Sequence, residues 1–176
     1  MHQEDVVAKQ AKVKTNAMRI LDKHRIPYTT CTYDDALLSA VDVAEVLGVP
    51  ASQVYKTLVV FADEQRHLLV VVPGDSELDP RKVARAVGAK HVRMAPQREA
   101  ERLTGLKVGG ISPLALLDKH FEIYLNASAE KLDKLYINGG QRGVNLRLKV
   151  ADLLMVTKAK VISATSGDKE TGEQDS

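Results

Sequence analysis

The chain has 176 residues, of which 44% are hydrophobic and 27% are charged, as in an ordinary globular domain. Its 25 Lys and Arg and 23 Asp and Glu give a formal net charge of +2, which neither requires nor excludes a nucleic-acid partner. The single cysteine, Cys31, excludes an internal disulfide and favours a reducing compartment. No apolar run approaches the roughly 20 residues of a membrane span, and the polar N-terminus lacks a signal-peptide core. We therefore expect a cytoplasmic protein with no membrane partner.

The two ends of the chain differ from its middle. Residues 1–14 are charged and weakly periodic, which predicts a polar extension. Residues 166–176 contain no large apolar side chain and predict a disordered tail, since they cannot offset the entropy lost on ordering. Residues 15–163 hold no repeat and no flexible linker, so we expect one compact domain there.

The first predicted elements are a helix and a strand. Thr15 or Asn16 caps the helix, which ends before Pro27. Helical spacing gives it an inward face made of Ala17, Ile20, Leu21 and His24. Residues 28–33 are β-branched and aromatic and predict a strand.

A second helix and a hairpin follow. Ser39 caps the helix and Gly48 ends it. Its predicted inward residues are Val43, Val46 and Leu47. The apolar runs at 54–61 and 67–72 are joined by the polar residues 63–65, which predicts a hairpin.

The second half of the chain alternates short helices and strands. Asp79 and Pro80 mark a helix start, because a capping carboxylate precedes a proline, and Gly88 ends that helix. The other predicted elements are a strand over 90–94, a helix from Pro96 to Gly105, strands over 122–125, 135–138 and 144–150, a helix over 152–157 and a strand over 160–162. Short strands with irregularly placed helices predict an α/β (α+β) domain, with a mixed sheet curled toward a partial barrel and flanking helices.

Standard catalytic constellations are missing from the sequence. It contains no nucleophile elbow and no glycine-rich nucleotide loop. No metal-ligand spacing relates the five histidines, which are His2, His24, His67, His91 and His120. The residues therefore predict no metal, no cofactor and no nucleophilic triad.

Lys56 interrupts an apolar strand in residues 54–60, VYKTLVV. A buried ammonium is unfavourable unless it is paired, so Lys56 must reach solvent, find a partner or face a cleft. A solvated lysine at the edge of a sheet is the structural alternative.

Two glycine-rich segments are further candidates. Residues 108–114, VGGISPL, contain paired glycines that let the backbone approach a ligand, and the amides of such a turn can bind phosphate or an oxyanion. A tight connection without a ligand is the alternative. Residues 138–143, NGGQRG, predict a hairpin loop.

One stretch of the chain is uniformly basic. Between Asp79 and Glu99 there is no acid. Its six cations are Arg81, Lys82, Arg85, Lys90, Arg93 and Arg98. The stretch favours a basic face for a phosphate backbone, and balance by acids distant in sequence is the alternative. With 4% aromatic residues and no tryptophan, contacts to phosphates and shape are favoured over base stacking.

In this order, the segments resemble the YbaK and prolyl-tRNA-synthetase-associated domain family, over about residues 15–162. The resemblance rests on residues 53–58 (QVYKTL), 86–90 (AVGAK), 104–105 (TG), 108–114 (VGGISPL) and 139–143 (GGQRG). It implies a deacylase that acts in trans on the ester between an amino acid and the terminal ribose of a mischarged tRNA. Cys-tRNA(Pro) is the first expected substrate, and prolyl-tRNA synthetase is an expected partner.

The resemblance also implies roles for individual residues. Lys56 is expected to hold the phosphate near the terminal adenosine, and Gly109 to place backbone groups at the aminoacyl carbonyl. Further substrate-binding residues are expected at Tyr33, Thr57, Gly110, Ile111, Ser112 and Asn145. Contacts to tRNA are expected at Arg81, Lys82, Arg85 and Arg142. The implied mechanism needs no enzyme nucleophile, because the thiol of the cysteine substrate attacks the ester carbonyl and cyclises.

Two departures from the family pattern concern the amino-acid pocket. Asn145 stands where members often carry an acid, and Ser39 stands in a shortened segment where an aromatic residue is expected. Alanine or another small residue is therefore an alternative to cysteine. A module that binds aminoacyl-tRNA or a synthetase without hydrolysis is a second alternative, and a Schiff-base role for Lys56 is a third.

Overall fold

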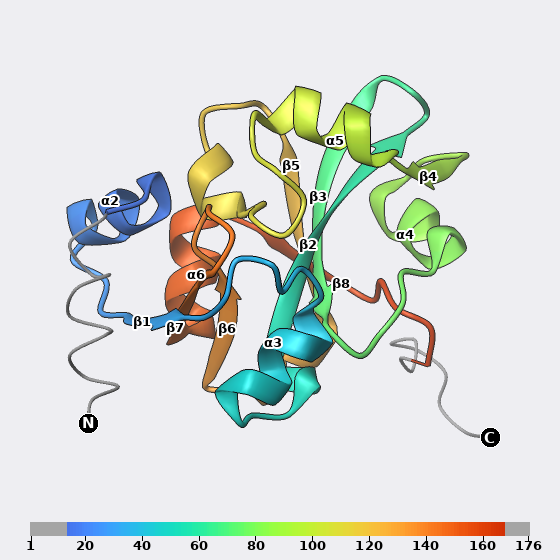
Figure 1. Cartoon of the computed structure of the whole chain (residues 1–176). Helices are drawn as coiled ribbons and strands as arrows, with labels where there is room; N and C mark the ends of the chain where they lie inside the picture. Colours follow the sequence, from blue (N-terminus) through green and yellow to red (C-terminus); the bar gives the residue numbers. More distant parts are fainter. Residues whose placement is uncertain (1–13, 168–176) are drawn as a thin grey trace, which may run out of the picture.

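The fold is built on one eight-stranded mixed sheet, in a computed structural model that describes residues 14–167 (Figure 1). The strand order is β1-β7-β6-β2-β3-β5-β8, and β4 also pairs with β2. The strands are β1 (Thr29–Thr32), β2 (Val54–Ala62), β3 (Arg66–Pro73), β4 (Val92–Met94), β5 (Glu122–Asn126), β6 (Lys134–Asn138), β7 (Val144–Lys149) and β8 (Lys160–Ile162). Three neighbouring pairs are parallel, namely β2 with β6, β3 with β5, and β5 with β8. The predicted mixed α/β fold is confirmed.

Short helices surround the sheet. The α-helices are α2 (Asn16–Lys23), α3 (Ala40–Leu47), α4 (Pro80–Val87), α5 (Gln97–Thr104) and α6 (Val150–Thr157). Single 3-10 turns lie at η1 (Ala51–Gln53), η2 (Pro113–Leu116) and η3 (Ala127–Lys131). In the described part of the chain, no helix is long and apolar enough to cross a membrane.

The predicted helix ends are confirmed by their capping geometry. The Asp79 carboxylate accepts hydrogen bonds from the backbone N–H groups of Arg81 and Lys82, and Pro80 occupies the first turn. The Ser39 hydroxyl accepts from the N–H of Asp42 in the same way. Three helices end at a glycine with left-handed backbone: Gly48, Gly88 and Gly105. These signals are local, which is why the sequence shows them.

Two predicted inward positions are wrong. His24 is exposed and bonds the Ile20 carbonyl, while Met18 is buried in its place. On α3, Val46 is 60% exposed, and the buried positions are Val43 and Ala44. A helix of two turns contacts the core along a narrow stripe, so a small error in the assumed rotation exchanges a buried residue for an exposed one.

The two faces of the sheet pack against different helices. On one face, α4 contributes Val83 to a cluster with Val60, Leu68 and Val70 of the central strands. On the other, α2 and α6 pack against β6 and β7, with Leu21 and Leu153 among the buried residues. Figure 1 shows α2 (blue) and α6 (orange-red) on the left of the molecule and α4 (green) on the right.

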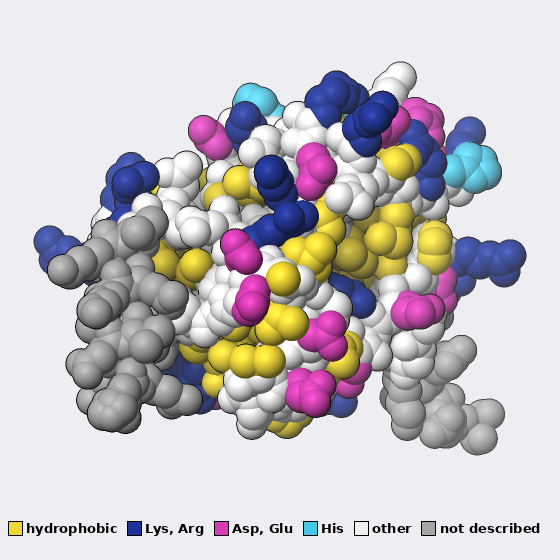
Figure 2. All heavy atoms as spheres, viewed as in Figure 1, with side chains coloured by type: hydrophobic (Ala, Val, Ile, Leu, Met, Phe, Trp, Pro, Cys, Tyr) yellow, Lys and Arg dark blue, Asp and Glu magenta, His cyan; other side chains and the backbone are white. Residues whose placement is uncertain are grey.

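The central strand β2 has one edge that is only partly paired. Its other edge pairs with β3 along its length. On the partly paired edge, β6 meets Val54 and Tyr55, and β4 meets residues 60–62. Residues 56–59 therefore lie in a gap between two strands. A hollow lined with hydrophobic atoms is visible between α5 and α3, to the right of centre in Figure 2.

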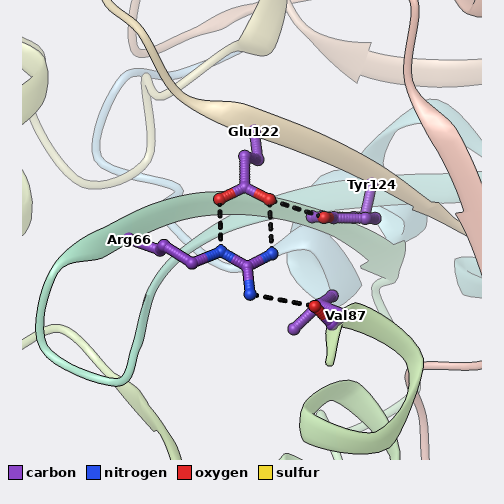
Figure 3. A network of polar contacts seen from close by, with 4 residues as sticks. All are labelled: Arg66, Val87, Glu122 and Tyr124. Atoms are coloured by element: carbon purple, nitrogen blue, oxygen red, sulfur yellow. Dashed lines mark hydrogen bonds and ion pairs between the residues drawn. The ribbon is translucent and has the colours of Figure 1, made fainter. Parts of the chain in front are cut away.

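A polar network ties β3 and β5 to the end of α4 (Figure 3). The Arg66 guanidinium makes two bonds to the Glu122 carboxylate, at 2.8 and 2.6 Å, and a third to the Val87 carbonyl at 2.9 Å. Tyr124 donates its hydroxyl proton to the same carboxylate at 2.7 Å. The Arg66 guanidinium lowers the pKa of the Glu122 carboxyl from its ordinary value.

The chain beyond β8 stays attached to the fold. Ala164 and Thr165 are buried, although they lie past residue 163, the predicted end of the domain. The Ala164 carbonyl accepts from the N–H of Asp79 at 2.8 Å, and Ser166 donates its N–H to the Glu77 carbonyl at 3.1 Å. Except for Lys14, Ser166 and Gly167, the predicted extension (1–14) and tail (166–176) lie outside the described residues.

Candidate active site

The gap beside β2 opens into a cleft of about 350 Å³. Its walls come from α3 and the loop before it, from residues 94–100, from the turn at residues 108–111, and from the ends of β6 and β7. This volume lies at the lower end of the range of about 300–1,000 Å³ that is typical of small-molecule pockets. Among the described residues, Lys56 is the only charged side chain on the wall of the cleft.

Lys56 is the third residue of β2, at a point where the strand has no neighbouring strand on one edge. Its side chain is partly buried, and Nζ lies 3.4 Å from the Gly74 carbonyl oxygen. No carboxylate of residues 14–167 forms an ion pair with it. A partly desolvated ammonium without a counter-ion attracts an anionic ligand.

Thr57 brings unpaired polar groups to the same place. The Val59 carbonyl faces the open edge, because it accepts from the N–H of Ala95 at 2.9 Å. Backbone groups alternate between the two edges of a strand, so Thr57 presents its N–H and C=O to the open edge as well. Its hydroxyl is buried and has no hydrogen-bond partner in the described structure. The cleft therefore offers a ligand the backbone groups of Thr57 at the open edge of β2.

Tyr33 and Asn145 form a pair at another part of the wall. Asn145 is 4% exposed, and its Nδ2 donates to the Tyr33 hydroxyl oxygen at 3.0 Å. Its Oδ1 is buried and has no partner among the described residues. Burial raises the pKa of Tyr33, so its hydroxyl keeps its proton at neutral pH. Both residues line the cleft.

The turn at residues 107–110 borders the cleft at Gly109. The Gly110 N–H donates to the Lys107 carbonyl at 2.7 Å, and Gly109 has a φ of +91°, as a type II turn requires. A Cβ at Gly109 would lie 2.8 Å from Leu38 Cδ2. Both the backbone conformation and the close approach of Leu38 therefore select glycine at this position.

The structure brings most of the predicted substrate-binding residues together. Six of the predicted residues line the cleft: Tyr33, Lys56, Thr57, Gly109, Ile111 and Asn145. Gly110 and Ser112 do not. Gly110 packs against the backbone of Arg142, and Ser112 is fully buried, with a hydroxyl that has no partner in residues 14–167.

The predicted tRNA-binding residues lie elsewhere. Arg81, Lys82 and Arg85 are on α4 and Arg142 is in the loop after β6; none lines the cleft. Lys82 Nζ donates to the Thr165 carbonyl at 3.0 Å, and Arg142 Nε donates to the Val108 carbonyl at 2.8 Å.

The basic stretch is not uniformly basic in space. Arg93 pairs with Glu64 at 2.8 Å and lies over the ring of Phe61, with 4.5 Å to its centroid. The alternative of balance by an acid distant in sequence therefore holds for Arg93.

Sequence reasoning missed Asn138 as a residue of the site. The predicted hairpin loop between β6 and β7 is confirmed, and Asn138 begins it. Its Oδ1 accepts from the N–H groups of Gly140 and Gln141, and its Nδ2 donates to the Gly109 carbonyl at 2.7 Å. An asparagine directly before two glycines indicates the first contact, whereas the second depends on the fold. No cluster of metal-ligating side chains occurs within residues 14–167.

Comparison with known proteins gives concordant matches. Residues 35–156 match the sequence model of a family described as "Aminoacyl-tRNA editing domain". The chain is 34% identical over 160 residues to "Putative Cys-tRNA(Pro)/Cys-tRNA(Cys) deacylase EbsC" of Enterococcus faecalis, covering 90% of this chain and 97% of that protein. It is 32% identical over 110 residues to a proline–tRNA ligase of Sulfurihydrogenibium sp., covering 62% of this chain and 19% of the ligase. A solved structure described as "a putative trans-editing enzyme for prolyl tRNA synthetase" matches with a TM-score of 0.72 and 25% identity, covering 88% of this chain and 99% of that chain.

Proposed function

The chain belongs to the aminoacyl-tRNA editing domain family, and from this premise we propose that it removes cysteine from mischarged tRNA(Pro) in trans. The expected class of enzyme, an aminoacyl-tRNA deacylase, is confirmed by the family match and by the relatives. The amino acid, the tRNA, the mechanism and the partner are the proposed part.

The observation that carries the proposal is the position of Lys56. It is the one charged side chain among the described residues that line the cleft, and it lies at the open edge of β2 without a carboxylate partner. Charge complementarity therefore selects an anionic group beside a small pocket. The 3′ end of an aminoacyl-tRNA has this arrangement, with a phosphate next to the terminal nucleoside and its ester.

The chemistry of the cleft supports catalysis by the substrate's own thiol. Its lining has no carboxylate, imidazole or thiol among the described residues. In the proposed step, the cysteine sulfur bonds to the ester carbonyl carbon and the bond from that carbon to the ribose oxygen breaks. The proton of the thiol is transferred to the ribose oxygen, so the products are a cyclic thioester and a free tRNA 3′ end. Lys56 and Gly109 would contribute by holding the ester in place.

Cysteine is proposed because a relative at 34% identity carries Cys-tRNA in its name, and because the described lining of the cleft has no carboxylate, imidazole or thiol. Alanine is the alternative amino acid, and the experiment must distinguish it from cysteine. It is an alternative because Asn145 stands where family members often have an acid. An uncharged residue there changes the attraction for the ammonium group of the ester but leaves the pocket small.

A synthetase partner is also proposed. The chain resembles about a fifth of a proline–tRNA ligase, which indicates that related domains work within that enzyme. We propose that this chain acts with prolyl-tRNA synthetase in the cytoplasm, where the synthetase supplies recognition of the tRNA. Omission of the synthetase should then reduce the preference for tRNA(Pro) over other tRNAs that carry cysteine.

Hydrolysis of three esters tests the proposal. Purified protein is incubated with Cys-tRNA(Pro), Ala-tRNA(Pro) and Pro-tRNA(Pro), with Lys56→Ala as the test variant. Lys134→Ala is the control, because Lys134 is an exposed lysine on a neighbouring strand and does not line the cleft. We expect fast loss of the cysteinyl ester, a fall of about 100-fold or more in kcat/KM for Lys56→Ala, and no change for Lys134→Ala.

The thiol mechanism has its own test. The 2-aminobutyryl ester has the size of the cysteinyl ester but lacks sulfur, so it should survive. Its rapid hydrolysis, or a preference for the alanyl ester, would refute the thiol step and leave the deacylase. Survival of all three natural esters would favour a module that binds without hydrolysis.

A further inference from the structure

The backbone of the turn at residues 107–110 is almost fully hydrogen-bonded. The Val108 N–H donates to the Glu101 carboxylate at 2.8 Å, and the Gly110 N–H donates to the Lys107 carbonyl at 2.7 Å. Polar backbone groups near the interior of a protein are nearly always paired, so an exception in such a turn needs an explanation.

Both carbonyls of the turn are also held. The Val108 carbonyl accepts from Arg142 Nε at 2.8 Å, and the Gly109 carbonyl accepts from Asn138 Nδ2 at 2.7 Å. Of the five backbone groups from the Val108 N–H to the Gly110 N–H, the Gly109 N–H alone has no partner within the described residues.

The direction of this N–H follows from the planar peptide. In a trans peptide, the C=O of Val108 and the N–H of Gly109 point in opposite directions. Arg142 holds the carbonyl toward the 139–143 loop and does not line the cleft, whereas Gly109 does. The unpartnered N–H therefore lies on the side of the peptide opposite to the Val108 carbonyl that Arg142 holds, and Gly109 itself lines the cleft.

We infer that Glu101, Asn138 and Arg142 are positioning residues, which hold the Gly109 N–H toward the carbonyl oxygen of the bound ester. The inference rests on the proposed function. Attack on the ester develops negative charge on that oxygen, and an oriented amide stabilises this charge more than it stabilises the ground state. The positioning residues should thus act on kcat and leave KM nearly unchanged.

Arg142 was expected to contact tRNA, and the two roles make opposite predictions for three variants. Arg142→Gln places an amide nitrogen at the position of Nε along the side chain but removes the charge. Arg142→Lys keeps the charge and puts a carbon at that position. Arg142→Met keeps neither the donor nor the charge. The set therefore separates a donor that orients Gly109 from a cation that binds phosphate.

The experiment measures kcat, KM and their salt dependence for the four proteins on the ester that the wild type hydrolyses fastest. For a positioning role we expect Arg142→Gln to retain most of the wild-type kcat. We expect kcat to fall about 10- to 100-fold in Arg142→Lys and Arg142→Met, with KM within about twofold, since loss of a complete oxyanion donor lowers kcat by about 10²–10³. Activity in Arg142→Lys, a raised KM in Arg142→Gln and a weaker salt dependence would instead assign Arg142 to phosphate binding and overturn its positioning role.

Asn138→Asp provides a second test, in a variant that is expected to keep the fold of the loop. The carboxylate still accepts from Gly140 and Gln141, so the loop keeps its bonds, but it repels the Gly109 carbonyl. We expect a similar fall in kcat with a nearly unchanged thermal midpoint, and no effect of Gln141→Ala, whose side chain is exposed. Equal kcat in all these variants would overturn the inference alone. Inactivity of the wild type on every ester would overturn the proposed function itself.

Discussion

Asn145 donates a hydrogen bond of 3.0 Å from Nδ2 to the hydroxyl oxygen of Tyr33, and so joins β7 to the residue that follows β1. The amide is 4% exposed and its oxygen is already without a partner among the described residues. The bond to Tyr33 is therefore the only hydrogen bond of the Asn145 side chain within the described residues.

Tyr33→Phe should destabilise the fold by about 1–2 kcal/mol, because it leaves a buried amide with neither end bonded. Tyr28→Phe is a matched control, since Tyr28 donates its hydroxyl proton to Asp22 in an exposed pair. There we expect a loss of less than about 0.5 kcal/mol. Urea unfolding of both variants measures the difference in the free energy of unfolding. Equal losses would contradict the larger contribution that we expect from the Asn145 contact.

Thr57→Val should stabilise the protein and weaken its activity. The Thr57 hydroxyl is buried without a partner, so its removal with conserved shape is expected to raise the free energy of unfolding by up to about 1 kcal/mol. Thr57 also lines the cleft, and the substitution should lower kcat/KM for the ester. Ser112→Ala is the comparison: its hydroxyl is also buried without a described partner but does not line the cleft, so its activity should stay unchanged. Loss of activity in Ser112→Ala would restore Ser112 as a substrate-binding residue.

Gly109→Ala should lose both stability and activity. Its φ of +91° disfavours any side chain by about 1–2 kcal/mol, and the new Cβ would lie 2.8 Å from Leu38 Cδ2. Gly88→Ala is a control for the backbone term, because Gly88 has a φ of +71° with nothing within 4 Å of the added Cβ. We expect a larger loss of thermal midpoint in Gly109→Ala than in Gly88→Ala, because of the added contact with Leu38, and a fall in kcat for Gly109→Ala alone. A normal kcat in Gly109→Ala would exclude the turn from the reaction.

The Arg66–Glu122 pair should give the fold a defined dependence on acid. Because Arg66 lowers the pKa of Glu122 in the folded protein, the pair stabilises fully above the ordinary glutamate pKa of 4.5. The contribution is lost as the pH falls through the lowered value. Glu122→Gln should therefore be less stable than wild type by about 1 kcal/mol at neutral pH, and this difference should disappear at strongly acidic pH. Glu64→Gln, in a more exposed pair with Arg93, should show a smaller difference, and a constant difference for Glu122→Gln across the pH range would contradict the assignment.

Several parts of the fold could be predicted because their causes are local. Asp79 followed by Pro80 begins a helix through bonds to the next residues, and Gly88 ends it through a left-handed backbone. The hairpin of β2 and β3 joins two strands that are adjacent in sequence. Lys56 could be selected for the same reason, since a lysine in an apolar strand is visible in a few residues of sequence.

The sequence alone determined the helix ends, the hairpin, the candidate lysine and the family resemblance. The tertiary structure decided that β6 and β4 leave residues 56–59 of β2 without a neighbouring strand on one edge, so that Lys56 opens into a cleft. It also decided that Arg142 bonds the Val108 carbonyl and that Arg93 is paired with Glu64. The physical reason is the range of the interactions: caps and turns depend on neighbouring residues, whereas an open strand edge, an unpaired N–H or a balanced charge depends on which distant segments meet.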